Sequence, residues 1–302
     1  MACERLPSMS ITVSDAIVAR VARTYGDFFE SLSKVPAGKS ARDVLDEAKV
    51  HEQMALFCKQ LRKVPEHFLP GKKLLEIGSG FCVFLAVSRR DYGLESFGVE
   101  PATHRFDCSF AIGQEVLTEY ELQPDIVKNA CAEALPWPDN YFDLAYSTNV
   151  LEHVNDPDRV MRETIRVLKP GGYAQFVFPN YDSIFDGHYA LPWLPHSSKE
   201  VAKLWMRLWG RDPSFIDSLQ LLTEKDARRW ASWPEIDVLG FGKDVFMDRM
   251  QSGNFSTWAG LGMVKTWVNM ARRAGLARLC AKALVACRAY TPIILTFTKR
   301  AA

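Results

Sequence analysis

A short apolar run followed by two closely spaced glycines constrains the fold of this chain more than any other feature. Residues 74–77 predict a buried strand. Gly78 and Gly80 come next, and a glycine lets the backbone turn sharply without a side chain that would block a ligand. Residues 81–90 have helical spacing, so the glycines lie between a parallel strand and its crossover helix. The pattern predicts an α/β fold with a ligand crevice at the carboxyl ends of its strands.

Two acidic residues accompany these glycines. Glu76 lies at the end of the first predicted strand, and Glu100 ends a second one, residues 95–100. A carboxylate at this distance from the glycines accepts hydrogen bonds from both hydroxyls of a ribose, which favours a nucleoside-containing ligand. Dinucleotide sites and S-adenosylmethionine sites both use such glycines. The dinucleotide pattern fits poorly, because Val83 occupies the position of its third glycine.

The composition is that of an ordinary globular protein. The 302 residues are 48% hydrophobic and 24% charged, enough for one large α/β domain with insertions or for two small domains. With no run of 18 apolar residues we expect no membrane-spanning helix, and the first ten residues lack the apolar centre of a secretory signal. The seven cysteines form no C-x-x-C pair, so we expect reduced thiols and a cytoplasmic protein.

The charge is unevenly distributed. Residues 249–302 contain nine basic residues and no acidic one, although the net charge of the whole chain is only +1. Within this region, residues 264–290 form a basic amphipathic stretch. It either packs as a cap with solvated charges or contacts a membrane surface or a lipid-linked anionic substrate. Nucleic acid is a weaker candidate for the anionic partner, because no known nucleic-acid-binding module is present.

The remaining elements follow from periodicity and from turn signals. We expect helices at 14–32, 42–63, 103–120, 158–168 and 223–231, and strands at 125–129, 143–147, 173–178, 235–241 and 291–297.

Five motifs occur in order along the chain. They are Glu76-x-Gly78-x-Gly80, Glu100, Leu135-Pro136-Trp137-Pro138-Asp139-x-x-Phe142-Asp143, Val150-Leu151-Glu152-His153-Val154 and Leu168-Lys169-Pro170-Gly171-Gly172. Together they resemble the class I S-adenosylmethionine-dependent methyltransferases, of the type 11 and ubiquinone-biosynthesis-like group. The resemblance covers residues 70–180 closely and the rest more loosely.

The resemblance implies a Rossmann-like, seven-stranded, mostly parallel sheet with helices on both faces and an antiparallel last strand. We therefore expect four parts. They are an N-terminal helical lid at 1–70, a cofactor-binding core at 71–180, a cap insertion at 181–222, and a C-terminal part of the core at 223–302 with the basic insertion at about 243–290.

The resemblance also implies S-adenosyl-L-methionine as cofactor, S-adenosyl-L-homocysteine as product, and a set of contact residues. The implied cofactor-binding residues are Glu76, Gly78, Ser79, Gly80, Glu100, Pro101, Ala132, Glu133, Ser147 and Thr148. Two positions depart from the family pattern: Cys82 replaces a common third glycine, and Cys131 replaces an aspartate that hydrogen-bonds adenine.

Methyl transfer to a hydroxyl acceptor requires positioning of the acceptor and a base that removes its proton. We expect His188 to be this base, with Asp186 or Tyr181 nearby; His153 is equally a candidate catalytic and a candidate structural residue. Glu152 and His153 resemble the metal ligands of some related quinone O-methyltransferases, but with two ligands alone we expect no metal.

These observations favour an enzyme, a methyltransferase acting most plausibly at oxygen of a small-molecule, sugar or lipid-linked acceptor. The alternative is a catalytically inactive protein that binds S-adenosylmethionine and serves as a partner or regulatory subunit, which the substitutions at Cys82 and Cys131 favour. A nicotinamide-dependent oxidoreductase ranks third, because the Leu-Pro-Trp-Pro-Asp and Lys-Pro-Gly-Gly motifs have no role in it.

Overall fold

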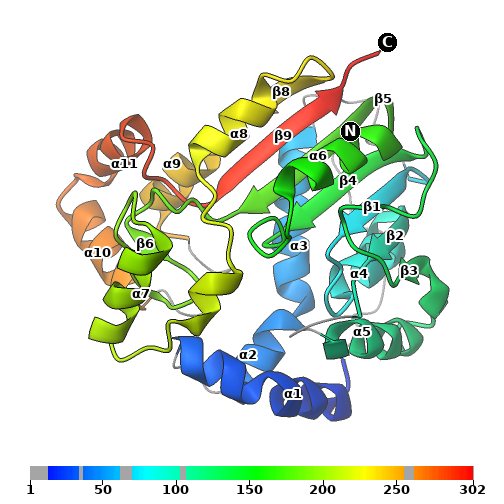
Figure 1. Ribbon diagram of the computed structural model, residues 1–302, viewed down its shortest axis with the longest axis horizontal. Coiled ribbons are helices and arrows are strands. Elements are labelled where there is room, and N and C mark those ends of the chain that lie inside the picture. Colours follow the sequence, from blue (N-terminus) through cyan, green and yellow to red (C-terminus); the bar gives the residue numbers. More distant parts are fainter. Residues whose placement is uncertain (1–12, 34–36, 62–69, 103–106, 255–261, 302) are drawn as a thin grey trace.

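A seven-stranded sheet forms the centre of the protein (Figure 1). The computed structural model describes residues 13–33, 37–61, 70–102, 107–254 and 262–301. The strands of the sheet, in the spatial order β3-β2-β1-β4-β5-β9-β8, are β1 Lys73–Ile77, β2 Glu95–Val99, β3 Val127–Lys128, β4 Phe142–Thr148, β5 Leu168–Phe178, β8 Ile236–Gly240 and β9 Ile293–Lys299. A separate antiparallel pair consists of β6 Phe185–Asp186 and β7 Leu191–Pro192.

Strand direction agrees with the predicted fold. β1 pairs in parallel with β2 and β4, and β4 pairs in parallel with β5. β9 runs antiparallel to both of its neighbours, β5 and β8. The mostly parallel sheet with a reversed last strand is thus confirmed. Because parallel strands end at the same edge, the glycine turn after β1 and the loops after β2, β4 and β5 all meet there.

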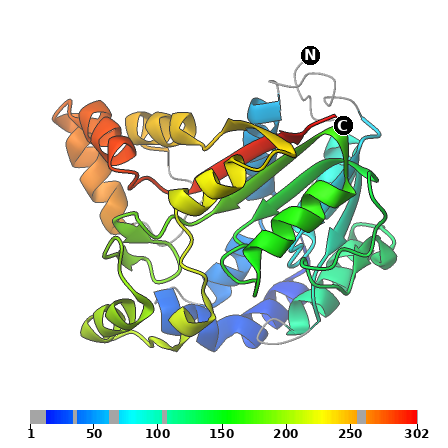
Figure 2. The same cartoon turned by 45° about the horizontal axis from the view of Figure 1, so that its top comes forward.

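Helices cover both faces of the sheet (Figure 2). They are α1 Asp15–Ser33, α2 Ala37–Val44, α3 Glu47–Leu61, α4 Val83–Tyr92, α5 Asp107–Glu119, α6 Pro157–Val167, α7 Lys199–Leu208, α8 Glu224–Ala231, α9 Lys243–Ser252, α10 Gly262–Arg273 and α11 Ala277–Ala286, with 3₁₀ turns η3 Pro124–Ile126 and η4 Ser214–Ser218. Within the described residues, no helix is both long enough and apolar enough to cross a bilayer.

Alternate residues of each strand pack against different helices, as the two-residue period of a strand requires. Leu74 and Tyr146 lie in a core with residues of α1, α3, α4 and α5. Leu75 and Ala145 face the other way, into a core with residues of α6, α8 and α11. Both faces of β1 and β4 are therefore buried, which explains why apolar residues occupy successive positions in each strand, Leu74-Leu75 in β1 and Leu144-Ala145 in β4.

Capping residues in the sequence explain where two helices, α6 and α8, begin. The Asp156 side chain accepts a hydrogen bond from the Arg159 N–H (3.0 Å) and begins α6 directly before Pro157. Thr223 and Asp226 form a reciprocal capping box at the start of α8.

The prediction of one helix over residues 42–63 is wrong at its beginning. The chain forms α2 up to Val44, and α3 then begins at Glu47. Asp46 separates them, because its side chain accepts the Ala48 N–H (2.9 Å) in the manner of a helix cap. Between the two expected helices, residues 34–36 lie outside the described residues, and residues 37 and 38 already belong to α2.

The insertion at 181–222 and the N-terminal helix pack together beyond the carboxyl edge of the sheet (Figure 1). Leu32 of α1 belongs to the same buried cluster as Tyr189, Trp193 and Phe215 of the insertion. The insertion is also joined to the loop after β4, because the Gln220 N–H donates to the Glu152 carbonyl (2.7 Å). The expected lid and cap are therefore in contact with each other, and the cap also contacts the loop after β4.

The expectation of reduced cysteines is wrong for Cys58, which is disulfide-bonded. Five other cysteines are free: Cys82, Cys108, Cys131, Cys280 and Cys287. Cys3 lies outside the described residues.

The burial of β9 predicts a large difference between two leucine substitutions. Leu295 is fully buried in β9, whereas Leu208 at the end of α7 is 72% exposed. We expect Leu295→Ala to lower the free energy of unfolding by about 3 kcal/mol and Leu208→Ala to change it by less than about 0.5 kcal/mol. Urea unfolding followed by circular dichroism measures both. Equal effects would contradict the assignment of β9 to the core.

Candidate active site

The glycine turn after β1 has the backbone geometry that its sequence predicts. Gly78 has a φ of 74°, and a side chain there would overlap that of Val150. Gly80 has a φ of 49° and faces open space. The Gly80 N–H donates a hydrogen bond to Oε2 of Glu100 (2.9 Å), so the turn after β1 is linked to the end of β2.

The carboxylates of Glu76 and Glu100 are both buried in this region. Burial raises the pKa of Glu100 to about 7, although the Gly80 N–H opposes this shift. Burial and the neighbouring Glu100 raise the pKa of Glu76 well above its ordinary value. One oxygen of Glu76, Oε2, is buried and has no hydrogen-bond partner among the described residues. Two buried acids, one with an unsatisfied acceptor, suit a cationic ligand that also carries hydroxyl donors.

The Cys82 side chain packs against α5. Cys82 has a left-handed backbone (φ 60°), the conformation for which a glycine is the usual residue. The Cys82 side chain is fully buried against Gly113 of α5. A Cβ added at Gly113 would lie only 2.7 Å from the Cys82 sulfur. Burial raises the pKa of this thiol well above its ordinary value. The thiol therefore fills the space between the glycine turn and α5.

Two of the other predicted cofactor residues hold the loops together. The Ser147 hydroxyl donates to the Ile77 carbonyl (3.0 Å), which joins β4 to β1. The Glu133 carboxylate accepts the Asn155 N–H (2.9 Å) and so ties the predicted adenine-side loop to the loop before α6. These side chains shape the edge of the crevice through contacts within the protein.

The remaining predicted residues lie at the same edge. Ser79 and Ala132 are buried, whereas Pro101 and Thr148 are half-buried at the ends of β2 and β4. Cys131 is exposed.

The predicted catalytic histidines lie together at the end of β4. His153 follows β4, and His188 comes from the insertion; their rings are 5.4 Å apart and nearly perpendicular. Nε2 of each ring is 3.8 Å from Oε1 of Glu152. Nδ1 of His188 lies 3.3 Å from Oδ1 of Asp186. Phe215 packs against both rings.

The two histidines differ in their preferred charge. Burial and the neighbouring His188 lower the pKa of His153 to about 3, so this ring is neutral at pH 7. Burial alone would lower the pKa of His188, but Asp186 and Glu152 outweigh it and the net shift is upward. Burial raises the pKa of Glu152 to about 7, and within the described part of the chain neither of its carboxylate oxygens has a hydrogen-bond partner. Of the two rings, His188 is the better proton acceptor.

Tyr181 contacts His188 through its hydroxyl, which lies 3.4 Å from Nδ1. Burial, followed by Asp186 and Glu152, raises the pKa of Tyr181 well above its ordinary value. The hydroxyl therefore stays protonated and can orient the ring of His188, but it does not act as a base.

The cluster also has the donor set of a metal site. One ligand atom each from Glu152, His153 and His188 lie within 4.8 Å of one another. Imidazole and carboxylate groups bind divalent cations, and Asp186 would orient the ring of His188 from its other nitrogen. The sequence alone suggests only Glu152 and His153 as ligands, because His188 is 35 positions further along the chain than His153.

The N-terminal helix reaches the glycine turn through Tyr25. Its ring packs edge to face on Phe81 (5.5 Å), and its hydroxyl lies 2.5 Å from that of Ser109 on α5. No sequence motif marks aromatic or hydroxyl groups that act by packing. The sequence therefore did not reveal the contacts of Phe81, Ser109 and Phe215.

Comparison with known families agrees with this geometry. Residues 75–176 match a family model described as "Methyltransferase domain", and residues 127–236 match a second model with the same description.

Several curated relatives come from mycobacteria. An uncharacterized protein of Mycobacterium tuberculosis (strain H37Rv) is 31% identical over 122 residues, which is 40% of this chain and 41% of the relative. An uncharacterized methyltransferase of Mycolicibacterium vanbaalenii is 30% identical over 165 residues, or 53% of this chain and 61% of the relative. The chain thus spans about two-fifths to three-fifths of the length of these relatives.

Among solved structures, phosphoethanolamine N-methyltransferase 2 of Haemonchus contortus in complex with S-adenosyl-L-methionine is similar to this chain. The identity is 16% with a TM-score of 0.47, and the match covers 80% of this chain and 52% of that one.

The raised pKa of Glu100 predicts a pH-dependent stability. Its ordinary value is 4.5 and its value in the folded protein is about 7, so the folded state binds more protons and loses stability as the pH rises from 4.5 through 7. Glutamine carries no charge at any of these pH values. We expect Glu100→Gln to be more stable than the unmodified protein by about 2–3 kcal/mol at pH 8 and equally stable near pH 4.5.

Urea unfolding of the ligand-free protein at both pH values measures this difference. Glu95→Gln, at an exposed position of the same strand, is the control and should show no such pH-dependent gain. An equal pH dependence of Glu100→Gln and the unmodified protein would contradict the raised pKa.

Proposed function

Since this chain belongs to the class I S-adenosylmethionine-dependent methyltransferases, we propose that it transfers a methyl group from S-adenosylmethionine to an oxygen of a small-molecule, sugar or lipid-linked acceptor. The observation that carries this proposal is the position of two groups at one edge of the sheet. The glycine turn with Glu76 and Glu100 lies at the ends of β1 and β2, and the cluster around His188 lies beyond the ends of β4 and β5. A cofactor and an acceptor bound at these places would meet.

The crevice residues fit this cofactor. When bound, S-adenosylmethionine supplies an electrophilic methyl group on a sulfonium. Glu100 would accept hydrogen bonds from the ribose hydroxyls, and the unsatisfied oxygen of Glu76 would attract the positive charge of the amino-acid end. The space beside Gly80 leaves room for the ligand's approach.

His188 is the group that would take the proton from the acceptor hydroxyl. With Nδ1–H donating to Asp186, Nε2 is left to accept a proton. The Glu152 carboxylate, 3.8 Å from Nε2, would stabilise the imidazolium that forms. His153 stays neutral and packs against this pair.

Cofactor binding depends on Glu100 in this proposal. Because hydrogen bonds to a buried carboxylate contribute about 1.5–3 kcal/mol, we expect Glu100→Ala to weaken S-adenosylhomocysteine binding by roughly 10- to 100-fold. Calorimetric titration measures the change, with Glu95→Ala on the same strand as the control that binds normally. Undiminished binding by Glu100→Ala would remove Glu100 from the cofactor site.

The role of His188 can be separated from cofactor binding. We expect His188→Ala to slow methyl transfer by about 10²- to 10⁴-fold, because a positioned base is lost, while S-adenosylhomocysteine affinity changes less than about twofold. Release of S-adenosylhomocysteine over a panel of hydroxylated fatty acids, sugars and phenols measures the transfer. Unchanged turnover would exclude His188 as the base.

Removal of metal distinguishes a base from a metal ligand. If His188 is the base, dialysis against EDTA leaves the turnover unchanged. Loss of activity that is restored by Mg²⁺ or Zn²⁺ would instead assign Glu152, His153 and His188 to a metal centre.

We also propose that α10 and α11 contact anionic membrane surfaces. Large apolar side chains on these helices are exposed: Trp267 (48%), Met270 (55%), Leu276 (49%) and Leu279 (64%). Basic residues are exposed among them: Arg272, Arg273, Arg278 and Lys282. This mixture suits the headgroup region of an anionic bilayer.

The measurement is co-sedimentation with phosphatidylserine-containing vesicles. Each basic side chain contributes about 1 kcal/mol near such a surface, so reversing the charges of Arg272 and Arg278 to glutamate should weaken binding by more than tenfold. Binding should also fall as the salt concentration rises. Lys128→Glu, at an exposed position on β3, is the control. Absence of binding at low salt would end this proposal.

A further inference from the structure

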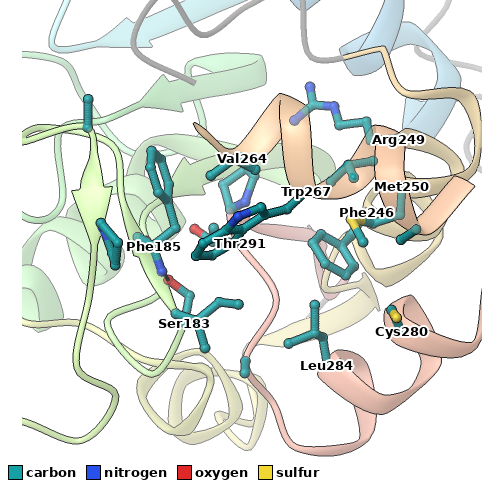
Figure 3. Close-up of a pocket in the computed structure, with 17 residues that line it drawn as sticks. Ser183, Phe185, Phe246, Arg249, Met250, Val264, Trp267, Cys280, Leu284 and Thr291 are labelled. Atoms are coloured by element: carbon teal, nitrogen blue, oxygen red, sulfur yellow. Dashed lines mark hydrogen bonds between the residues drawn. The ribbon is translucent and has the colours of Figure 1, made fainter. Parts of the chain in front are cut away.

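An apolar pocket of about 230 Å³ lies beside the histidine cluster and is not used by the mechanism proposed above (Figure 3). Its walls come from separate parts of the chain: β6 and its neighbours in the insertion, the helices α9, α10 and α11, and the segment before β9. Phe246, Trp267 and Leu284 are among the large side chains that face it. Such a lining favours an apolar chain or ring.

One charged group lines this apolar space. Among the described lining residues only Arg249, at the end of α9, carries a charge, and Figure 3 shows it at one edge of the pocket. Its side chain is half-buried, and burial lowers its pKa despite the opposing effect of Glu52 and Tyr146. No carboxylate in the described part of the chain lies within salt-bridge distance of its guanidinium. A partly desolvated cation of this kind is complementary to an anionic group on a ligand.

The pocket adjoins the transfer site on the histidine side. Phe185 lines the pocket, and the next residue on β6, Asp186, contacts His188 (3.3 Å). Successive residues of a strand point in opposite directions, so β6 separates the pocket from the histidines by a single strand.

The pocket also lies near the cofactor side. Burial, followed by Glu76, raises the pKa of Tyr146 on β4, and the charge of Arg249 opposes this rise. Tyr146 is therefore within electrostatic range of both Arg249 and Glu76.

We propose that this pocket binds the apolar chain of the methyl acceptor and that Arg249 pairs with an acidic group on the same molecule. The acceptor is then an acidic amphiphile, with a carboxylate or phosphate near an alkyl chain. This inference rests on the proposed methyl transfer for its role, but the binding itself is measured without turnover.

The first experiment is a calorimetric titration of the full chain, saturated with S-adenosylhomocysteine, with octanoate, decanoate and dodecanoate below their micelle concentrations. Burial of each methylene contributes a factor of roughly four in affinity, so binding should tighten with chain length until the pocket is filled. Dodecyl phosphate and dodecan-1-ol test the acidic group. The alcohol should bind at least tenfold more weakly than the carboxylate or the phosphate.

Variants separate the contributions of the chain and the charge. Arg249→Met should remove the preference for dodecanoate over dodecan-1-ol, whereas Arg207→Met, at an exposed position of α7, should retain it. Ala271→Trp fills the pocket and should weaken dodecanoate binding more than tenfold; Ala289→Phe fills it from another wall if the first variant does not fold.

S-adenosylhomocysteine affinity is measured for every variant and should not change. Equal dodecanoate binding by the unmodified protein and both Ala271→Trp and Arg249→Met would overturn the pocket proposal, as would absence of binding by every probe. Failure to bind S-adenosylhomocysteine would instead overturn the proposed function, so the two failures are distinguishable.

Discussion

The hydrogen bond from the Gly80 N–H to the Glu100 carboxylate joins the two turns on which the cofactor crevice depends. It fixes the turn after β1 against the end of β2, and it requires a backbone that only a residue without a Cβ adopts easily at Gly78 and Gly80. Burial raises the pKa of this carboxylate to about 7, and the same bond offsets only part of that shift. A cationic ligand with ribose hydroxyls relieves this cost, so the free protein is less stable at neutral pH than the bound one should be.

The histidine cluster is built jointly by the insertion and by the loop after β4. His188 and Asp186 come from residues 181–222, whereas Glu152 and His153 come from the loop after β4. Two contacts join these segments. The Gln220 N–H donates to the Glu152 carbonyl, and Phe215 packs against the rings of both histidines. In the proposed function, the general fold provides the cofactor edge and the insertion provides the acceptor side, where specificity among methyl acceptors would arise.

The sequence predicted the features that depend on local rules. The glycine turn, the start of α6 and the mostly parallel sheet with its reversed last strand follow from residue type, from spacing and from the family motifs. Features that depend on distant segments were not predictable in this way. The meeting of His188 with Glu152, and the pocket around Arg249, each require the course of an insertion that no periodicity specifies. The break at Asp46 within a continuous helical pattern was missed because a single side-chain cap outweighed the apolar spacing.

A crystal structure of the complex with S-adenosylhomocysteine tests the central claim most directly. We expect the ribose hydroxyls to donate hydrogen bonds to Glu100 and the amino-acid end of the ligand to lie beside Glu76. The ligand sulfur should face the space between β4 and His188. A ligand bound elsewhere, or a ribose that does not contact Glu100, would contradict the assignment of this crevice as the cofactor site.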